Sequence, residues 1–184
     1  PVSQQNPRKA TESNPFFKAS ELYMMYPPFD QIKNDHYAPA FERGMSEQIA
    51  EVESIANNAE PATFENTLLP MEKSGATLAR VSRVFYALSS AHTNDDIKAV
   101  RADVAPKLSA HSDAILLNSA LFVRVKAIHD ALPELDLDAE SKRLVTETYK
   151  DFIGAGAQLS PEDKEKLKAY NSELATLTTQ FSSN

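Results

Sequence analysis

Apolar side chains recur at steps of three and four residues along most of this chain, and this spacing limits the fold more than any other feature of the sequence. Such steps place side chains on one face of an α-helix, whereas a half-buried β-strand alternates every second residue. Glycine occurs only 4 times in 184 residues, which is too few for the turns of a β-rich chain of this size. The sequence therefore predicts an all-α fold.

About seven helices follow from the apolar stripes, read together with capping and breaking residues. They are expected at about residues 36–55, 63–75, 78–92, 94–115, 121–132, 138–153 and 160–181. Asn94, Asp138 and Ser160 stand where a side-chain oxygen can accept a first-turn N–H. Pro70 is expected to bend the second helix and Pro106 to kink the fourth, because proline lacks an N–H and clashes with the preceding turn.

Residues 15–34 are rich in proline and aromatic side chains and have no helical period. They predict an extended N-terminal segment. Its aromatic residues Phe16, Phe17, Tyr23 and Phe29 are expected to pack against the helices that follow.

The end of the chain predicts a long antiparallel helical hairpin. Gly154-Ala-Gly156 closes one helix and Ser160-Pro161 opens the next, so two long apolar stripes are joined by a short loop. The second stripe spans only about two heptads, which favours a seam inside the molecule over a dimer zipper. It still continues at Phe181, without a stop signal after it. We therefore expect a truncated part of a larger protein, with an exposed apolar patch on this hairpin.

Residues 1–13 are polar and aperiodic, and they predict a disordered leader in front of a helical domain at 14–184. Such a leader is what remains after an export signal is cleaved, although a native tail has the same character. The leader slightly favours a periplasmic over a cytoplasmic location.

Charge and composition exclude several classes of partner. The net charge of -7 repels phosphate backbones and anionic lipid, which argues against nucleic acid or a membrane surface as the main partner. The chain has no cysteine, so disulfides and thiolate metal sites are excluded. It also has no apolar run near the ~20 residues of a membrane-spanning helix.

The histidines and carboxylates of this sequence match no known motif for metal binding or acid–base catalysis. The four histidines are His36, His92, His111 and His129. None belongs to a His-Glu-x-x-His pair and none has a glutamate three residues before it, so each is interpreted as structural. The carboxylates fall mainly on polar helix faces or in first turns, where a solvated surface explains them.

Two further patterns also lack the context that chemistry would need. Gly154-Ala-Gly156 has no third glycine and no Lys-Ser/Thr, so it is interpreted as a helix terminus and not as a phosphate loop. No serine stands in a Gly-x-Ser-x-Gly setting. The sequence therefore assigns no catalytic, cofactor-binding or metal-binding residue to this chain.

Several stretches nevertheless resemble the N-terminal region of bacterial zinc peptidyl-dipeptidases. They are Asn14–Phe17, Pro28–Ile32, His36–Phe41, Asn66–Gly75, Ala91–Asp95, Leu117–Val125, Gly154–Gly156 and Asn171–Phe181. The similarity covers about residues 14 to 184 with little sign of insertion, which is more specific than any one short motif. The family is that of thimet oligopeptidase and oligopeptidase A, and the dipeptidyl-carboxypeptidase branch fits best.

The resemblance implies a monomeric, all-helical, zinc-dependent enzyme that releases C-terminal dipeptides from oligopeptides. A helical N-terminal region in such enzymes helps to form the wall or roof of a deep channel that excludes folded proteins. Their zinc is held by a His-Glu-x-x-His helix and a downstream glutamate, none of which is present here, so no site residue is carried over.

Two hypotheses remain. In the first, the chain is the structural and substrate-gating region of such a peptidase, is inactive by itself, and has the remainder of its own chain as its partner. In the second, it is a stand-alone helical adaptor or inhibitor that binds a protein partner through an apolar groove.

Overall fold

The computed structural model describes residues 14–91 and 93–181, and this part of the chain is all-α. The α-helices are α2 (Tyr37–Ala56), α3 (Leu69–Lys73), α4 (Ala76–Ala91), α5 (Asp95–Leu116), α6 (Ser119–Ala131), α7 (Ala139–Gly154) and α8 (Pro161–Phe181). Short 3-10 turns occur at Pro15–Phe17, Tyr23–Met25, Asn34–His36 and Leu132–Glu134, and a π-helical turn at Phe64–Leu68. The predicted fold class is confirmed. The predicted leader at 1–13 and His92 lie outside the described residues.

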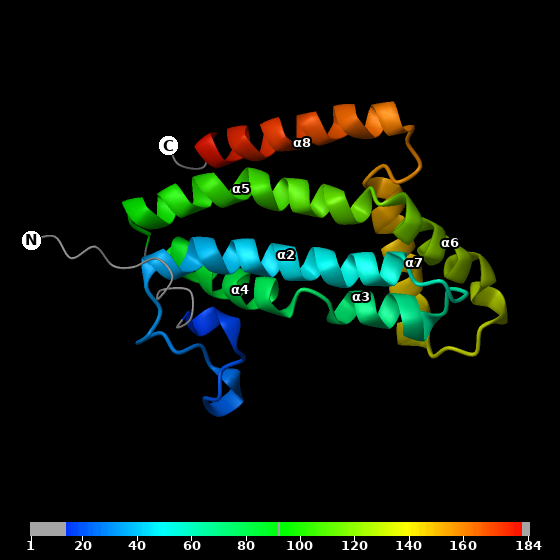
Figure 1. Cartoon of the computed structure of the whole chain (residues 1–184), viewed down its shortest axis with the longest axis horizontal. Helices are drawn as coiled ribbons and strands as arrows, with labels where there is room; N and C mark the ends of the chain where they lie inside the picture. Colours follow the sequence, from blue (N-terminus) through cyan, green and yellow to red (C-terminus); the bar gives the residue numbers. More distant parts are fainter. Residues whose placement is uncertain (1–13, 92, 182–184) are drawn as a thin grey trace, which may run out of the picture.

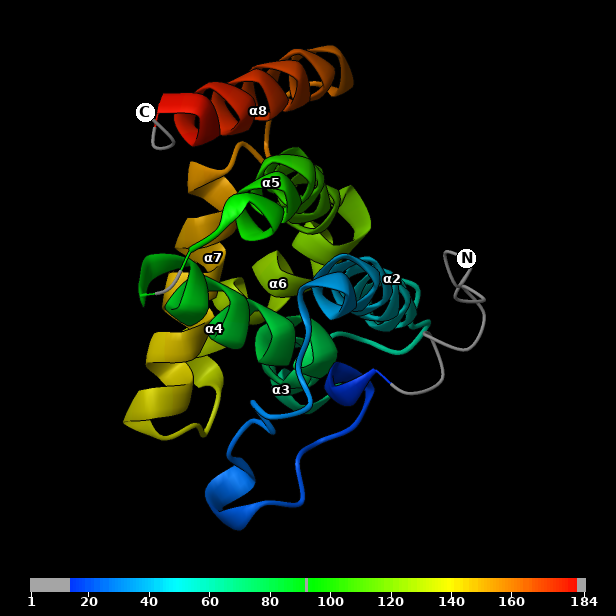
Figure 2. The same cartoon turned by 90° about the vertical axis from the view of Figure 1, so that its left-hand side faces the viewer.

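The long helices run side by side along the molecule, and two shorter ones close one end (Figure 1). α2 packs against both α4 and α5, and α5 in turn packs against α8. α6 and α7 pack on each other at the end where α2 and α5 terminate (Figures 1 and 2). The elements thus form a layered helical body, with α8 as its outermost layer.

Aromatic side chains fill the core at the N-terminal end of α2. Tyr37 and Phe41 from α2 meet Phe85 from α4, with ring centroids 5.1 and 5.3 Å apart in edge-on contacts. Burial of each such side chain stabilises the fold by about 1.5–3 kcal/mol. Gly44 lets the two helices approach closely, because a Cβ at this position would lie 2.7 Å from the backbone nitrogen of Leu78.

The predicted helix starts and proline effects can be followed residue by residue. Asn94, Asp138 and Ser160 accept the backbone N–H three residues on, so all three predicted caps are confirmed. Pro106 leaves α5 continuous, and Figure 1 shows α5 as one curved helix. Pro70 instead stands in the first turn of α3, where its missing N–H is tolerated, and the π-helical turn precedes it.

The final helix forms an antiparallel pair with α5 and not with α7 (Figure 1). Two polar side chains of α8, Lys164 and Asn171, make hydrogen bonds that favour this partner. The Nζ of Lys164 donates to the carbonyl of Leu117 at 3.0 Å and to the Oγ of Ser119 at 2.9 Å. The Nδ2 of Asn171 donates to Asp113 Oδ1, on α5, at 2.7 Å. The predicted hairpin partner is therefore corrected, because long-range contacts direct α8 away from its neighbour in sequence.

The N-terminal segment is only partly attached to the helices. Phe16 is buried and Phe17 is half-buried, as expected, but Tyr23 is 88% and Phe29 42% exposed. Residues 18–33, which we call the arm, project from the helical body (Figure 2). The chain on either side of the arm is joined at its base, where Asn14 Nδ2 donates to the carbonyl of His36 at 2.8 Å. The prediction that all four aromatic residues pack on the body was therefore wrong for Tyr23 and Phe29.

Candidate functional site

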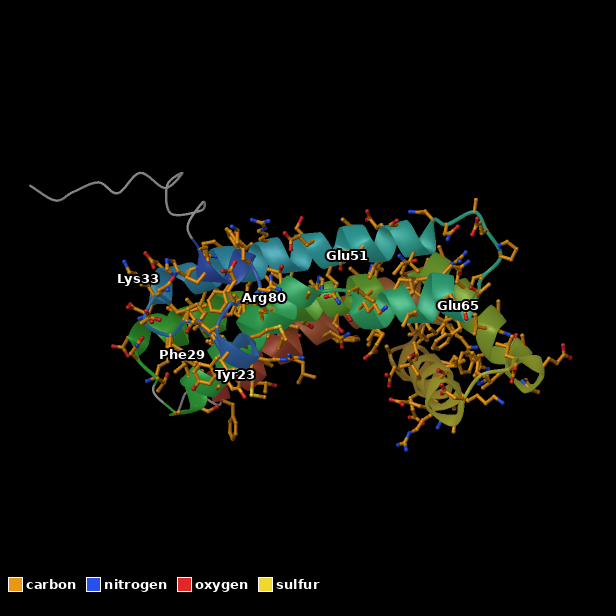
Figure 3. The ribbon with its side chains drawn as sticks, turned by 90° about the horizontal axis from the view of Figure 1, so that it is seen from below. Tyr23, Phe29, Lys33, Glu51, Glu65 and Arg80 are labelled. Carbon is orange, nitrogen blue, oxygen red and sulfur yellow. The ribbon has the colours of Figure 1, made fainter. Side chains whose placement is uncertain are left out.

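A cavity of about 520 Å³ lies between the arm and helices α3 and α4. Four of the five charged side chains that line it are cationic: Lys18, Lys73, Arg80 and Arg83, with Glu72 as the single acid. The arm contributes apolar walls to the same cavity through its methionines and prolines. Figure 3 shows the arm, with Tyr23 and Phe29, on the face of the molecule where Arg80 lies.

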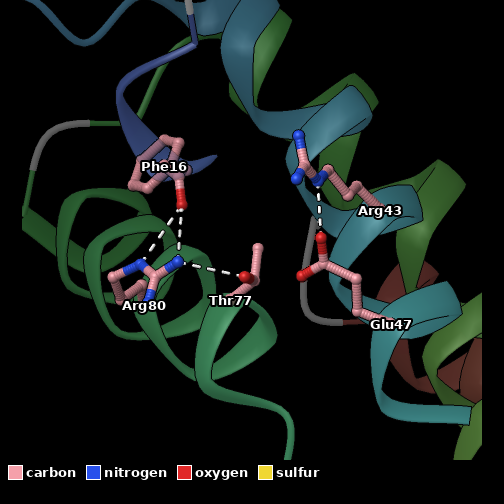
Figure 4. Close-up of polar contacts among 5 residues, drawn as sticks. All are labelled: Phe16, Arg43, Glu47, Thr77 and Arg80. Atoms are coloured by element: carbon pink, nitrogen blue, oxygen red, sulfur yellow. Dashed lines mark hydrogen bonds and ion pairs between the residues drawn. The ribbon is translucent and has the colours of Figure 1, made fainter. Parts of the chain in front are cut away.

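Arg80 is held in place by the base of the arm. Its Nε and Nη2 donate to the carbonyl of Phe16 at 3.2 and 3.1 Å, and Nη2 also donates to Thr77 Oγ1 at 3.0 Å (Figure 4). Its Nη1 has no hydrogen-bond partner within residues 14–91 and 93–181. One edge of a half-buried guanidinium is thus fixed while the other is free to bind an acceptor.

A second arginine, on α2, also contacts the N-terminal segment. Arg43 lies with its guanidinium carbon 4.3 Å from the ring centroid of Phe17, and its Nε donates to Glu47 Oε1 at 2.6 Å (Figure 4). This bond, followed by one from Thr77 and by the charges of Arg43 and Arg80, lowers the pKa of Glu47. Glu47 therefore stays ionised at neutral pH, with Arg43 as its hydrogen-bonded ion-pair partner.

The described histidines stand apart from one another, each with its own structural contact. His36 Nδ1 accepts the N–H of Lys33, His111 Nε2 contacts Gln48 Oε1 at 2.8 Å, and the ring of His129 stacks on Tyr149. Burial lowers the pKa of His111. Within the described ranges, no three His, Cys, Asp or Glu side chains come together in a way that could hold a metal ion.

Arg124 forms a buried polar network that the sequence pattern did not single out. It donates to the carbonyls of Asn58 and Glu60, to Asn66 Oδ1 and to Thr67 Oγ1, at 2.8 to 3.2 Å. These bonds fix the loop between α2 and α3 to α6. An arginine set among the apolar residues of a helical stripe was the one available signal for this role.

The stripe on α8 is exposed along much of its length, so the predicted apolar patch is present. Tyr170, Leu174, Leu177 and Phe181 are between 53% and 81% exposed, and we call this set the α8 face. The inner side of α8 borders a groove of about 370 Å³ whose other walls come from α5 and from Tyr86 on α4. An apolar surface of this kind is typical of a contact site.

No helix among the described residues is both long enough and apolar enough to cross a membrane.

Comparison with curated proteins identifies the relatives of this chain. It is 45% identical over 171 residues to the dipeptidyl carboxypeptidase of Escherichia coli and 46% identical over 169 residues to that of Salmonella typhimurium. These matches cover 93% and 92% of the chain. The chain is homologous to the dipeptidyl carboxypeptidases. No protein-family profile matches it.

Oligopeptidase A is a more distant relative of the same chain. The protein from Haemophilus influenzae is 26% identical over 172 residues, or 94% of the chain. Both the resemblance to peptidyl-dipeptidases and that to oligopeptidase A are therefore confirmed. The chain spans about a quarter of the length of these relatives: 25% of each dipeptidyl carboxypeptidase and 24% of this oligopeptidase A.

Proposed function

We propose that this chain is the N-terminal structural and substrate-gating region of a zinc metallopeptidase that removes C-terminal dipeptides from oligopeptides. The observation that carries the proposal is its 45% identity to a dipeptidyl carboxypeptidase over 93% of its length. Because the chain matches only 25% of that relative, its role is to shape access to chemistry performed elsewhere in the protein.

The donor groups of the described residues do not fit a catalytic zinc ion. Such a site needs three convergent protein ligands, commonly histidines with a carboxylate. His36, His111 and His129 instead lie in separate environments, and each is held by a different neighbour. No step of peptide hydrolysis is therefore assigned to these residues. In our proposal the zinc and the bond cleavage belong to the remainder of the protein, and this segment alone is inactive.

The α8 face supports the remainder of the same polypeptide as the first partner. Its four large side chains stand on the outer layer of the helical body, where a further lobe can pack against them. Burial of each stabilises an interface by about 1.5–3 kcal/mol before the entropic costs of docking. Oligopeptides are then the partners of the complete enzyme, admitted through a passage that this region helps to form.

Dipeptide release and zinc content test the proposal directly. The 184-residue chain should release no dipeptide from a blocked oligopeptide and should hold no stoichiometric zinc. The polypeptide encoded by the whole reading frame should release dipeptides and should hold stoichiometric zinc. Stoichiometric zinc or dipeptide release in the isolated 184-residue chain would refute the proposal.

The reading frame distinguishes the peptidase hypothesis from the second hypothesis, a stand-alone adaptor or inhibitor. Continuation beyond Asn184 into a His-Glu-x-x-His segment supports the peptidase region, whereas a stop codon immediately after Asn184 supports a stand-alone adaptor or inhibitor. The α8 face is compatible with either, because it offers an apolar contact surface in both cases.

A further inference from the structure

Cationic side chains converge on the cavity beneath the arm although the chain as a whole is acidic. The sequence has 26 Asp and Glu against 19 Lys and Arg, yet four of the five charged groups lining this cavity are cations. We propose that the cavity is a binding site for an acidic peptide segment. In this site the cations hold the peptide carboxylates, and the walls of the arm hold a neighbouring apolar side chain.

In the part of the chain that the structure describes, three of the four cations that line this cavity have unpaired side chains, whereas several lysines elsewhere on the molecule are paired with carboxylates. Lys107, Lys126 and Lys166 each pair with a carboxylate one helical turn away. By contrast, the side chains of Lys18, Lys73 and Arg83 have neither a hydrogen bond nor an ion pair within the described ranges. Glu72 is the single carboxylate in the lining, so the four cations are in excess and repel one another, and a bound carboxylate reduces that repulsion.

Arg80 gives the site a fixed centre. Its Nε and Nη2 are already bound to Phe16 and Thr77, so the guanidinium does not have to be ordered when a ligand arrives. The free Nη1 keeps two N–H donors, and Arg80 is one of the residues that line the cavity. A charge-assisted bond from a pre-oriented arginine is stronger than one from a flexible side chain, because less entropy is lost on binding.

The size and lining of the cavity suit a short peptide segment. Its volume of about 520 Å³ lies within the range of small-ligand pockets. Met24 and Met25 line it and are 80% and 72% exposed, so their flexible thioethers can adapt to an apolar side chain. Both residues have positive φ, 53° and 56°, a conformation that costs energy for residues other than glycine. Such strain is concentrated at ligand-binding segments.

The choice of a peptide as the ligand rests on the proposed function, whereas the cationic cavity does not. We therefore test binding without turnover, so that loss of the site and loss of the peptidase assignment give different results. If the peptidase proposal fails and the peptide still binds, only the biological source of the ligand changes.

The binding experiment compares two peptides that differ only in charge. Fluorescence anisotropy of the 184-residue chain is measured with labelled, end-blocked Leu-Glu-Asp-Leu and with its neutral counterpart Leu-Gln-Asn-Leu. The acidic peptide should bind at least about tenfold more tightly, and its affinity should fall between about 50 and about 300 mM salt. Equal affinity for the two peptides would overturn the proposal. So would inorganic phosphate binding as tightly as the acidic peptide, because that result describes a general anion site.

Matched variants locate the binding to this cavity. Arg83→Gln should weaken binding of the acidic peptide about fivefold, because it removes an unpaired cation from the lining. Arg143→Gln removes the same charge from an exposed position on α7 and should change the affinity less than about twofold. Equal effects of the two variants would show non-specific attraction and would contradict the proposal.

Arg80→Lys tests the arginine fork separately. It should weaken binding as well, and it is interpreted only if the circular dichroism spectrum and melting curve match those of the unmodified chain. If Arg80→Lys disturbs the fold, Arg83→Gln still decides the question, since Arg83 is exposed and makes no contact that the fold needs.

Discussion

Arg124 is a single residue on which a whole loop depends. Its guanidinium binds two backbone carbonyls and two side chains from residues 58 to 67, while only 7% of the residue is exposed. A buried acceptor left without a donor costs about 1–3 kcal/mol, more than the net gain from one formed hydrogen bond. Removal of Arg124 should therefore cost more stability than the net gain from its individual hydrogen bonds suggests.

Arg124→Ala is expected to lower the free energy of unfolding by about 2–4 kcal/mol, because four acceptors, one of them on the buried Thr67, lose their donor together. Urea denaturation followed by circular dichroism measures this change. Arg143→Ala, at an exposed position on α7, is the control and should stay within about 0.5 kcal/mol. A loss below about 1 kcal/mol for Arg124→Ala would mean that water replaces its hydrogen bonds.

His111 is expected to make stability depend on pH. Burial lowers its folded-state pKa, so below its unfolded pKa the unfolded chain binds more protons at this site than the folded chain does. The stabilisation is therefore present above the unfolded pKa and is lost as pH falls towards the folded pKa. The free energy of unfolding should decrease between about pH 7.5 and about pH 5.5, and this decrease should be smaller in His111→Gln than in the unmodified chain. The same decrease in both proteins would exclude His111 as the cause.

At the scale of the helices, a close backbone approach and a buried lysine determine which helices pair. α2 and α4 meet at Gly44, and α8 is fastened to the end of α5 by Lys164, which is 8% exposed. Both contacts join elements distant in sequence. Each can therefore be tested by one substitution with a control on an equivalent helix.

Gly44→Ala should destabilise the fold by about 1–3 kcal/mol, because the new methyl group meets the backbone of Leu78 and forces α2 and α4 apart. Thermal unfolding measures the effect. Gly154→Ala introduces the same methyl group on α7, where nothing lies within 4 Å, and should be neutral or stabilising by up to about 1 kcal/mol. Equal shifts in melting temperature would contradict the close approach at Gly44.

Lys164→Ala should loosen α8 selectively, since the carbonyl of Leu117 and the hydroxyl of Ser119 lose their donor. Hydrogen exchange is expected to become faster in α8 while α2 keeps its protection. Lys168→Ala, which removes only a surface pair with Glu165, serves as the control. Uniformly faster exchange across all helices would argue for global destabilisation instead.

Local signals in the sequence were sufficient for the helices but not for their partners. Asn94, Asp138 and Ser160 cap helices as predicted, because capping depends on residues only a turn apart. The pairing of α8 with α5 depends on Lys164 and Asn171 meeting groups more than 40 positions away, which no local pattern encodes. The cationic cavity escaped sequence reasoning for the same reason, since its charges come from the arm, α3 and α4.

At the scale of the whole molecule, the outermost layer, α8, leaves large apolar side chains uncovered. α8 packs on α5 through its inner side, while the α8 face carries four large apolar side chains towards solvent. Apolar surface of this kind favours association when no other part of the polypeptide covers it. The isolated chain should therefore tend to self-associate in solution through the α8 face.

The isolated chain is expected to associate reversibly as its concentration rises, and Leu174→Glu with Leu177→Glu should reduce that association at least about tenfold. Sedimentation velocity measures the effect. Gln180→Glu, an exposed polar change on the same helix, controls for added negative charge. Association that persists unchanged in the double variant would place the contact elsewhere on the molecule.

The bond from Asn14 to the carbonyl of His36 closes the base of the arm, so the residues between them form a loop whose ends are tied together independently of its tip. Lengthening such a loop costs little, about 0.6 kcal/mol for each doubling. Residues can therefore be inserted or exchanged near Tyr23 while the helical body keeps its packing. The arm is accordingly the place in this molecule where new recognition sequences can be grafted, by protein engineers or by evolution.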